Sequence, residues 1–316
     1  MAFPSLEEDI LRAIAYGQSV GFPLTLSGIA ERVQCPRSLD AVVLGVENLA
    51  ARGVISSWHG RFGIRPETRA LIEEYESRAA LTRVKWLHAL RALQVLAWVP
   101  WIRVVWVSGS LAYDASDADG DVDVVCLVMP GHIFSARFCA LVLTSLSGVR
   151  RAAHDVRAPD KLCMNHWIVD DGSALRHQSI YTAWVYAHMV PVYGAAYAQQ
   201  WIHHQAWMGK YLAYRAPHSP QRVVRVSRLS VWVKRFFELA LFFAEPFAQR
   251  IQVGRIARGV ATVGRGRIQA THRVLEFHPR SQEGAILKRY EAFCDSAGIV
   301  VRAPDSGLGS DACEIA

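Results

Sequence analysis

Residues 104–128 read VVWVSGSLAYDASDADGDVDVVCLV, and this stretch joins two apolar runs through a polar loop. The runs, at residues 104–107 and 122–128, are short and rich in valine, so they predict two buried strands. Side chains alternate along a strand, so Asp121 and Asp123 face the same side. Two such carboxylates repel each other unless a hard cation lies between them, and Mg²⁺ prefers oxygen ligands. The pair indicates a Mg²⁺ site; the alternative is two solvated acids beside a core strand.

The turn between the strands supplies a second feature. Gly109 lets the backbone bend sharply and approach a ligand closely. If a helix begins near Ser110, its free N–H groups and positive dipole end form an anion site. A turn that holds phosphate beside a carboxylate pair that holds metal favours phosphoryl or nucleotidyl transfer.

Gly109 and Ser110, ten intervening residues, and then Asp121-Val122-Asp123 before an apolar run resemble the signature of the DNA polymerase β-type nucleotidyltransferase superfamily. The resemblance implies a small mixed sheet and one or two Mg²⁺ ions held by Asp121 and Asp123. It also implies a nucleoside triphosphate (NTP) seated by Gly109 and Ser110. The implied reaction moves a nucleoside monophosphate to an acceptor hydroxyl.

In that superfamily a third carboxylate usually lies on a later strand and completes the metal site. Residues 161–169 (KLCMNHWIV) predict this strand, and Asp160 at its start is the best candidate for the third ligand and base. Asp155, Asp170 and Asp171 are rivals, and Asn165 in place of an acid would leave a weakened or inactive site. A weaker resemblance over most of the chain, through the segments DKLCMN and FHP, is to bacterial nucleotidyltransferase-domain proteins with an N-terminal winged helix.

The fold class that these patterns predict is α/β (α+β), in five regions. Residues 1–65 predict three helices and a hairpin, which resemble a winged-helix domain. Residues 66–98 predict a connecting helix, and residues 99–175 the nucleotidyltransferase core. Residues 176–303 predict a helical, basic region, and residues 304–316 a disordered tail.

The net charge of +7 is placed unevenly, since residues 221–290 carry 14 Arg or Lys against four acids. This basic region either attracts a triphosphate or another anion, or is simply a solvated face. Six cysteines without CxxC spacing predict reduced thiols and a cytoplasmic protein rather than disulfides or a zinc site. We find no signal-peptide pattern and expect no membrane span.

The third predicted helix, at residues 38–52, would be the DNA-reading helix of a winged-helix domain. Arg37 and Arg52 at its ends are balanced by Asp40 and Glu47, so it is close to neutral. A DNA-reading helix normally brings net positive charge to the phosphates. DNA binding is therefore possible but not favoured, and dimerisation or docking of a protein partner is the alternative.

Three functions follow as hypotheses. The first is Mg²⁺-dependent transfer of a nucleoside monophosphate from an NTP such as ATP to an unknown acceptor. The second is a non-catalytic, nucleotide-sensing regulator whose winged helix binds DNA or protein, which the lack of a clear third acid favours. The third is nucleotidylation (AMPylation) of a partner protein, as some minimal members of the superfamily perform.

Overall fold

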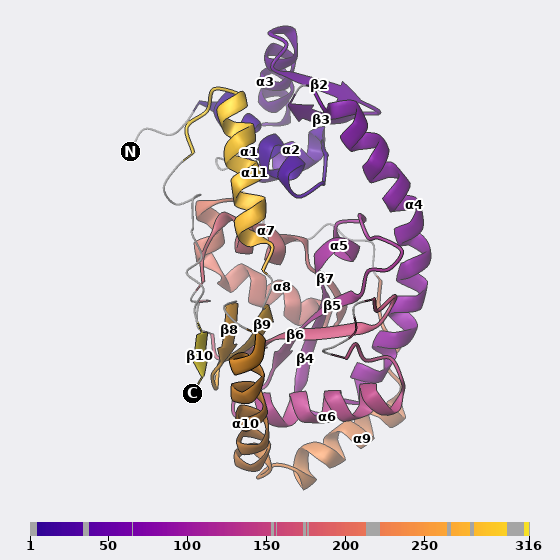
Figure 1. Ribbon diagram of the computed structural model, residues 1–316. Coiled ribbons are helices and arrows are strands. Elements are labelled where there is room, and N and C mark those ends of the chain that lie inside the picture. Colours follow the sequence, from indigo (N-terminus) through magenta and orange to yellow (C-terminus); the bar gives the residue numbers. More distant parts are fainter. Residues whose placement is uncertain are drawn as a thin grey trace.

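The computed structural model describes residues 5–33, 38–64, 66–152, 155, 157–172, 175, 177–212, 222–263, 267–278, 281–301 and 313–315. The chain is a mixed α+β protein, as predicted. A seven-stranded mixed sheet lies in one half of the molecule, and a mainly helical unit with a three-stranded sheet lies at the other end (Figure 1). Within the described part, no helix is long and apolar enough to cross a bilayer.

The helical unit is formed by the N-terminal segment, where the predicted three helices and hairpin are confirmed. Helix α1 starts because the Ser5 hydroxyl accepts a hydrogen bond from the Glu8 N–H at 3.3 Å. The buried face of α1 includes Ile10 and Ile14, at helical spacing. The elements are α1 (Leu6–Ser19), β1 (Leu24–Thr25), α2 (Leu26–Arg32), α3 (Leu39–Ala51), β2 (Ile55–Trp58) and β3 (Arg61–Ile64). Strand β3 lies between β1 and β2.

Helix α4 (Thr68–Leu93), followed by η1 (Gln94–Trp98), is the predicted connecting helix and runs along one side of the molecule to the large sheet (Figure 1). It also supports the polar loop before Asp121. Thr82 Oγ1 accepts a hydrogen bond from the Ser116 N–H at 3.0 Å, and Lys85 Nζ donates to the Gly120 carbonyl at 2.7 Å. The buried polar groups of α4 therefore fix the loop that leads into the second predicted strand.

The large sheet has the strand order β10-β8-β9-β6-β5-β4-β7. The strands are β4 (Ile102–Val107), β5 (Val122–Val128), β6 (Leu162–Val169), β7 (Val190–Tyr193), β8 (Arg267–Ala270), β9 (Val274–His278) and β10 (Cys313–Ile315). The two predicted strands β4 and β5 pair antiparallel, and β6 pairs parallel with β5. The central strands are buried on both faces, which explains their continuous apolar runs.

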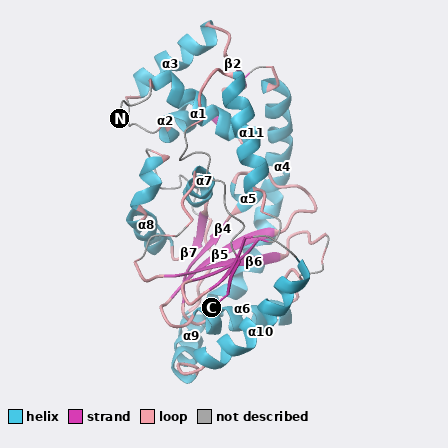
Figure 2. Ribbon diagram, turned by 60° about the vertical axis from the view of Figure 1, so that its left-hand side comes forward, coloured by secondary structure: helices cyan, strands magenta, loops and turns pink. Residues whose placement is uncertain are grey.

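Helices cover both faces of this sheet (Figures 1 and 2). On one face Trp106 packs against Trp201 of α8, with ring centroids 5.5 Å apart. On the other face Cys126 and Trp167 share a buried cluster with Phe134 of α6. The helices are α5 (Gly109–Ala112), α6 (Ile133–Leu146), α7 (Ile180–His188), α8 (Ala195–His204), η2 (Ala206–Lys210), α9 (Arg228–Ala240), α10 (Glu245–Val263) and α11 (Glu283–Ser296).

The C-terminal part departs from the prediction of a purely helical region at 176–303. Strands β7, β8 and β9 all come from it and extend the core sheet on both sides. Helix α11 then returns to the N-terminal unit, where Tyr290 packs on Tyr16 of α1 at 5.5 Å. Of the predicted disordered tail 304–316, residues 304–312 and 316 lie outside the described residues, whereas residues 313–315 form β10, parallel to β8. The physical reason is that β4, β5 and β6 alone leave sheet edges, which distant segments cover.

Glu245, at the start of α10, offers a test of how the helices are fixed on the sheet. Its two carboxylate oxygens accept hydrogen bonds from the Phe134 N–H at 2.9 Å and the Ser135 N–H at 2.8 Å. These are orphan donors of the first turn of α6. We expect Glu245→Ala to lower the free energy of unfolding by about 1–2 kcal/mol in urea titrations. Glu47→Ala, which removes an exposed acid, is the control; equal effects of the two substitutions would contradict this assignment.

Candidate functional site

The predicted carboxylates and the predicted turn meet in one cavity. Asp121 directly precedes β5, and Asp123 is the second residue of that strand. Both side chains line a cavity of about 430 Å³ between the sheet, α7 and the start of α11. The polar and charged side chains on its wall are those of Ser108, Ser110, Tyr113, Asp121, Asp123, Arg151, Cys163, Asn165, His166, Tyr181, Thr182, Tyr186, Arg267, His278, Ser281 and Gln282. The structure therefore brings Gly109, Ser110, Asp121 and Asp123 together, as the sequence spacing predicts.

Gly109 lies directly against the second carboxylate. Its φ of +65° is in the left-handed region, and a Cβ placed there would lie 2.3 Å from Asp123 Oδ2. The Ser108 N–H donates to the Asp123 carbonyl at 2.9 Å, which keeps the turn beside the strand. Only glycine satisfies both the backbone angle and the contact. The helix expected near Ser110 is present as α5, but it has a single turn, so its dipole contributes little.

Among the described residues, Asp160 does not line this cavity, so its assignment as the third acid is corrected. Asp160 lies in the turn before β6, with its carboxylate 2.8 Å from His88 Nδ1 and 3.3 Å from Lys85 Nζ of α4. Asp160 has a φ of +59° and precedes the first residue of β6, Leu162, whose side chain is in the buried cluster shared with α4 and α6. The ion pairs with α4 hold Asp160 away from Asp121 and Asp123.

The rival acids lie elsewhere too. Asp155 accepts a hydrogen bond from the Ala152 N–H at 2.8 Å. Asp170 accepts one from the Tyr197 hydroxyl, and Asp171 pairs with Arg273 at 3.1 Å. None of these carboxylates is on the cavity wall. Among the described residues that line the cavity, Asp121 and Asp123 are the only acids.

Cys163 occupies the position where a third carboxylate would complete the site. It is the direct β6 partner of Asp123 on β5, and ligand atoms of Asp121, Asp123 and Cys163 lie within 4.8 Å of one another. Burial, and then the two carboxylates, raise the pKa of the Cys163 thiol, so the thiol is neutral at pH 7. A neutral thiol is a poor ligand for a hard cation.

A β-bulge in β6 also changes which side chains face the cavity. Asp123 pairs with Cys163 but Val125 pairs with His166, so β6 contains one extra residue between these two pairs. The bulge brings His166 to the face that carries Cys163 and Asn165. Without the bulge, simple alternation along β6 would place His166 on the opposite face.

Arg151 is a site residue that the sequence pattern does not indicate. Its guanidinium donates to Asp121 Oδ2 and lies 3.9 Å from Cys163 Sγ. Even with this cation nearby, burial and the charge of Asp121 raise the pKa of Asp123 to about 7. Arg151 therefore relieves the repulsion between the two carboxylates only in part, and a divalent cation between them would remove it. The oxygen ligands of Asp121 and Asp123 therefore suit Mg²⁺, whereas the neutral thiol of Cys163 does not.

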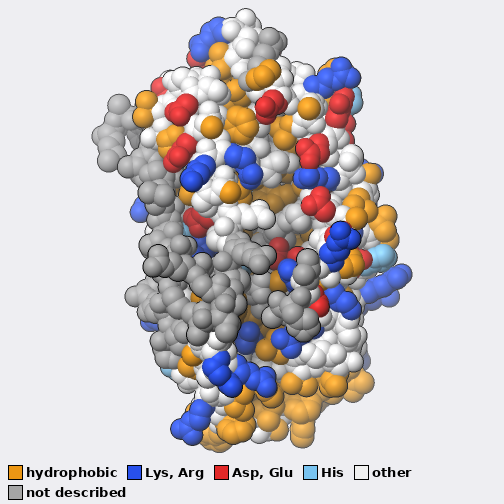
Figure 3. Space-filling model, viewed as in Figure 1, with side chains coloured by type: hydrophobic (Ala, Val, Ile, Leu, Met, Phe, Trp, Pro, Cys, Tyr) orange, Lys and Arg blue, Asp and Glu red, His pale blue; other side chains and the backbone are white. Residues whose placement is uncertain are grey.

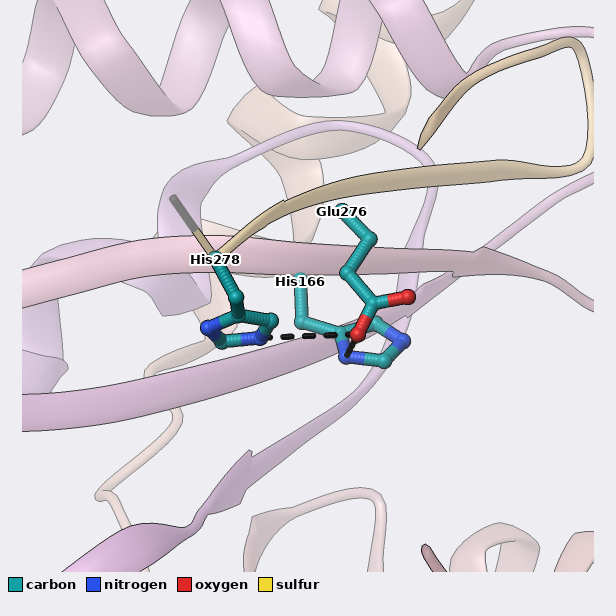
Figure 4. Close-up of side chains that lie close together, drawn as sticks. All are labelled: His166, Glu276 and His278. Carbon is teal, nitrogen blue, oxygen red and sulfur yellow. Dashed lines mark ion pairs between the residues drawn. The ribbon is translucent and has the colours of Figure 1, made fainter. Parts of the chain in front are cut away.

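A second cluster, beside the same cavity, consists of His166, Glu276 and His278 (Figure 4). Glu276 Oε1 lies 3.8 Å from His166 Nδ1 and 3.6 Å from His278 Nε2. Burial is the main cause that lowers the pKa of His166 to about 3 and of His278 to about 4, so both imidazoles are neutral. Neutral imidazoles and a carboxylate have metal-ligand character.

Within this cluster, however, the Glu276 carboxylate already pairs with the guanidinium of Arg267. Arg267 Nε donates to Glu276 Oε1 at 2.7 Å, and its Nη1 donates to Glu283 Oε2 at 2.7 Å. His177 and Ser179 also bind Glu283, at 2.9 and 2.8 Å. One guanidinium thus bridges the two buried carboxylates and compensates part of their negative charge, and we interpret the cluster as a hydrogen-bonded ion network beside the cavity. Its members come from β6, β8, β9 and α11, so short-range sequence patterns do not reveal it.

Gly109 allows a direct test of the turn. We expect Gly109→Ala to destabilise the fold and to weaken Mg²⁺ binding, because its Cβ would collide with Asp123 Oδ2. Gly131→Ala is the matched control, since Gly131 has a φ of +77° and a Cβ added to it would meet nothing within 4 Å. Gly131→Ala should lower the free energy of unfolding by only about 1–2 kcal/mol, the cost of placing alanine in the left-handed region. Thermal unfolding and Mg²⁺ titration of both variants check this; equal losses would contradict the close contact.

The raised pKa of Asp123 predicts a pH-dependent stability. The folded pKa of about 7 exceeds the unfolded value near 4, so the folded chain binds this proton more tightly. The contribution to stability is fully present below about pH 4 and is lost as the pH rises through 7. With EDTA present, Asp123→Asn should therefore be more stable than the wild type at pH 8, by on the order of 2 kcal/mol, and the gain should shrink at pH 5. Urea unfolding at both pH values measures this, and a gain independent of pH would refute it.

No family model, curated protein sequence or solved structure matches this chain. The chemistry of the cavity therefore has to be inferred from its own residues: two coupled carboxylates, a glycine turn, two arginines and a neutral thiol.

Proposed function

We propose that the cavity binds an NTP with Mg²⁺ and that the protein transfers the nucleoside monophosphate to an acceptor hydroxyl, with release of pyrophosphate. One observation carries this proposal. Asp121 and Asp123 face a common cavity beside the Gly109 turn, where burial, and then the charge of Asp121, raise the pKa of Asp123 to about 7. The polymerase β-type signature in the sequence supports the same conclusion, and ATP is the first nucleotide to test.

The residues of the cavity have distinct tasks in this proposal. Asp121 and Asp123 would hold Mg²⁺, which neutralises phosphate charge and polarises the phosphoryl oxygens when bound. Gly109 and Ser110 would present backbone N–H groups and a hydroxyl to phosphate oxygens. Arg151 neutralises Asp121 in the free protein, and the arriving metal would release its guanidinium to pair with phosphate. Burial of the cavity strengthens each of these charge interactions.

A second candidate, a nucleotide-sensing regulator without turnover, is favoured by Cys163. The thiol opposite Asp123 leaves the site with two carboxylates, enough to hold a metal with its nucleotide but without a third acid for the attacking oxygen. The order of α1, α2 and α3 followed by the β2–β3 hairpin supports a winged-helix module in such a regulator. The near-neutral charge of α3 favours a protein partner over DNA. Nucleotidylation of that partner is the version of the first proposal in which the acceptor is a protein.

Nucleotide binding and pyrophosphate release, measured separately on the full chain with Mg²⁺ and each of the four NTPs, distinguish these functions. Asp121→Asn with Asp123→Asn should abolish both, by at least about 100-fold for turnover. Undiminished binding and turnover in this double variant would refute both candidates. Mass spectrometry of the chain and of co-purified proteins after incubation detects a transferred nucleotide.

Cys163 separates the transferase from the sensor. If the site is catalytic, Cys163→Asp should raise pyrophosphate release several-fold by supplying the third carboxylate, whereas Cys163→Ser, the size-matched control, should not. If the wild type and Cys163→Asp both bind Mg²⁺–NTP without any release of pyrophosphate, the transferase proposal fails and the sensor stands.

A further inference from the structure

Helix α9 and the first turn of α10 carry an apolar ridge on the outside of the molecule. On α9 its residues follow helical spacing of three or four: Leu229 (63% exposed), Trp232 (71%), Phe236 (65%) and Leu239 (80%). Phe243 (89%), in the turn after α9, and Phe247 (71%), in the first turn of α10, complete it. Phe237 and Phe242 lie next to the ridge and are also exposed. In the space-filling view, hydrophobic side chains gather at the end of the molecule that α9 forms (Figures 1 and 3). A contiguous apolar surface of this kind marks an interaction site.

The orientation of α9 is the reverse of that of an ordinary surface helix, which turns its charged side outward. The Lys234 ammonium points inward and donates to the Ile102 carbonyl and, at 3.1 Å, to the Tyr193 hydroxyl. Glu238 also points inward, where Oε1 accepts a hydrogen bond from the Trp101 N–H at 2.9 Å. These polar contacts fix the helix with its aromatic side away from the core. The exposure of the ridge is therefore built into the packing.

The charge around the ridge has one sign. Arg225, Arg228, Arg235 and Arg250 are exposed beside it. The only acids between residues 222 and 258 are Glu238 and Glu245, and both are turned inward onto backbone N–H groups. The outward surface is thus apolar, aromatic and cationic.

This combination identifies the kind of partner. A second copy of the chain, ridge to ridge, would bring two rows of arginines together, which repel each other. An anionic lipid surface complements both features, because Trp, Phe and Leu enter the boundary between head groups and acyl chains while arginines pair with phosphates. We infer that α9 and the start of α10 seat the protein peripherally on an anionic lipid bilayer. This inference is independent of the proposed catalytic function.

Vesicle co-sedimentation of the full chain tests the inference. The wild type should bind vesicles of phosphatidylcholine with phosphatidylglycerol and should bind pure phosphatidylcholine vesicles at least about tenfold more weakly. The triple variant Trp232→Ser, Phe236→Ser, Phe243→Ser should lose at least about tenfold in binding. Because all three side chains are exposed, the variant should retain the wild-type fold, which circular dichroism checks.

Leu87→Ser with Leu146→Ser is the matched control, since these leucines are 60% and 81% exposed on α4 and α6, outside the ridge. This control should bind as the wild type does. Equal losses in both variants, or no vesicle binding by the wild type, would overturn the inference. Light scattering tests whether a second copy of the chain covers the ridge instead. A wild type that is dimeric and does not bind vesicles, together with a monomeric triple variant, would assign the ridge to a dimer interface.

Discussion

The site depends on one constraint: two carboxylates that repel each other are held on the same face at the start of a buried strand. Pairing of β5 with β4 and β6 leaves Asp121 and Asp123 no freedom to separate, and the Ser108–Asp123 backbone hydrogen bond holds the Gly109 turn against them. The protein keeps this arrangement although burial and mutual repulsion raise the pKa of Asp123 to about 7. Electrostatic repulsion that the surrounding fold maintains, with a strongly shifted pKa, is typical of ligand-binding sites.

The side chains around Asp121 and Asp123 determine the net charge of the site. Arg151 compensates Asp121 and is in position to transfer its charge to a phosphate, whereas Cys163 adds no charge at all. Elsewhere on the cavity wall, Arg267 joins Glu276 to Glu283, and its guanidinium compensates part of their negative charge. At Asp121 and Asp123 a divalent cation would improve the electrostatics, because the two carboxylates repel each other.

Polar contacts also decide what the far end of the molecule presents to its surroundings. Lys234, Glu238 and Glu245 bind backbone groups of β4, of the turn before it and of α6. Unpaired backbone groups are costly when buried, so satisfying them determines the rotation of α9. The aromatic ridge then faces outward as a consequence. A sequence pattern with Arg scattered among Phe, Leu and Val shows an amphipathic helix, but it does not show which side is buried.

The sequence by itself determined the features that depend on local spacing. These are the helix at residues 38–52, the two strands around the polar loop, and the shared face of Asp121 and Asp123 next to Gly109, because side-chain periodicity is set within each element. Only the tertiary structure decided that Cys163 rather than Asp160 lies opposite Asp123, since this depends on strand register, on a bulge in β6 and on the ion pairs of Asp160 with α4. It likewise brought Arg267 and His278 to the cavity and turned the apolar side of α9 outward. These features depend on contacts between segments far apart in the chain, where burial and charge compensation outweigh the local secondary-structure propensity.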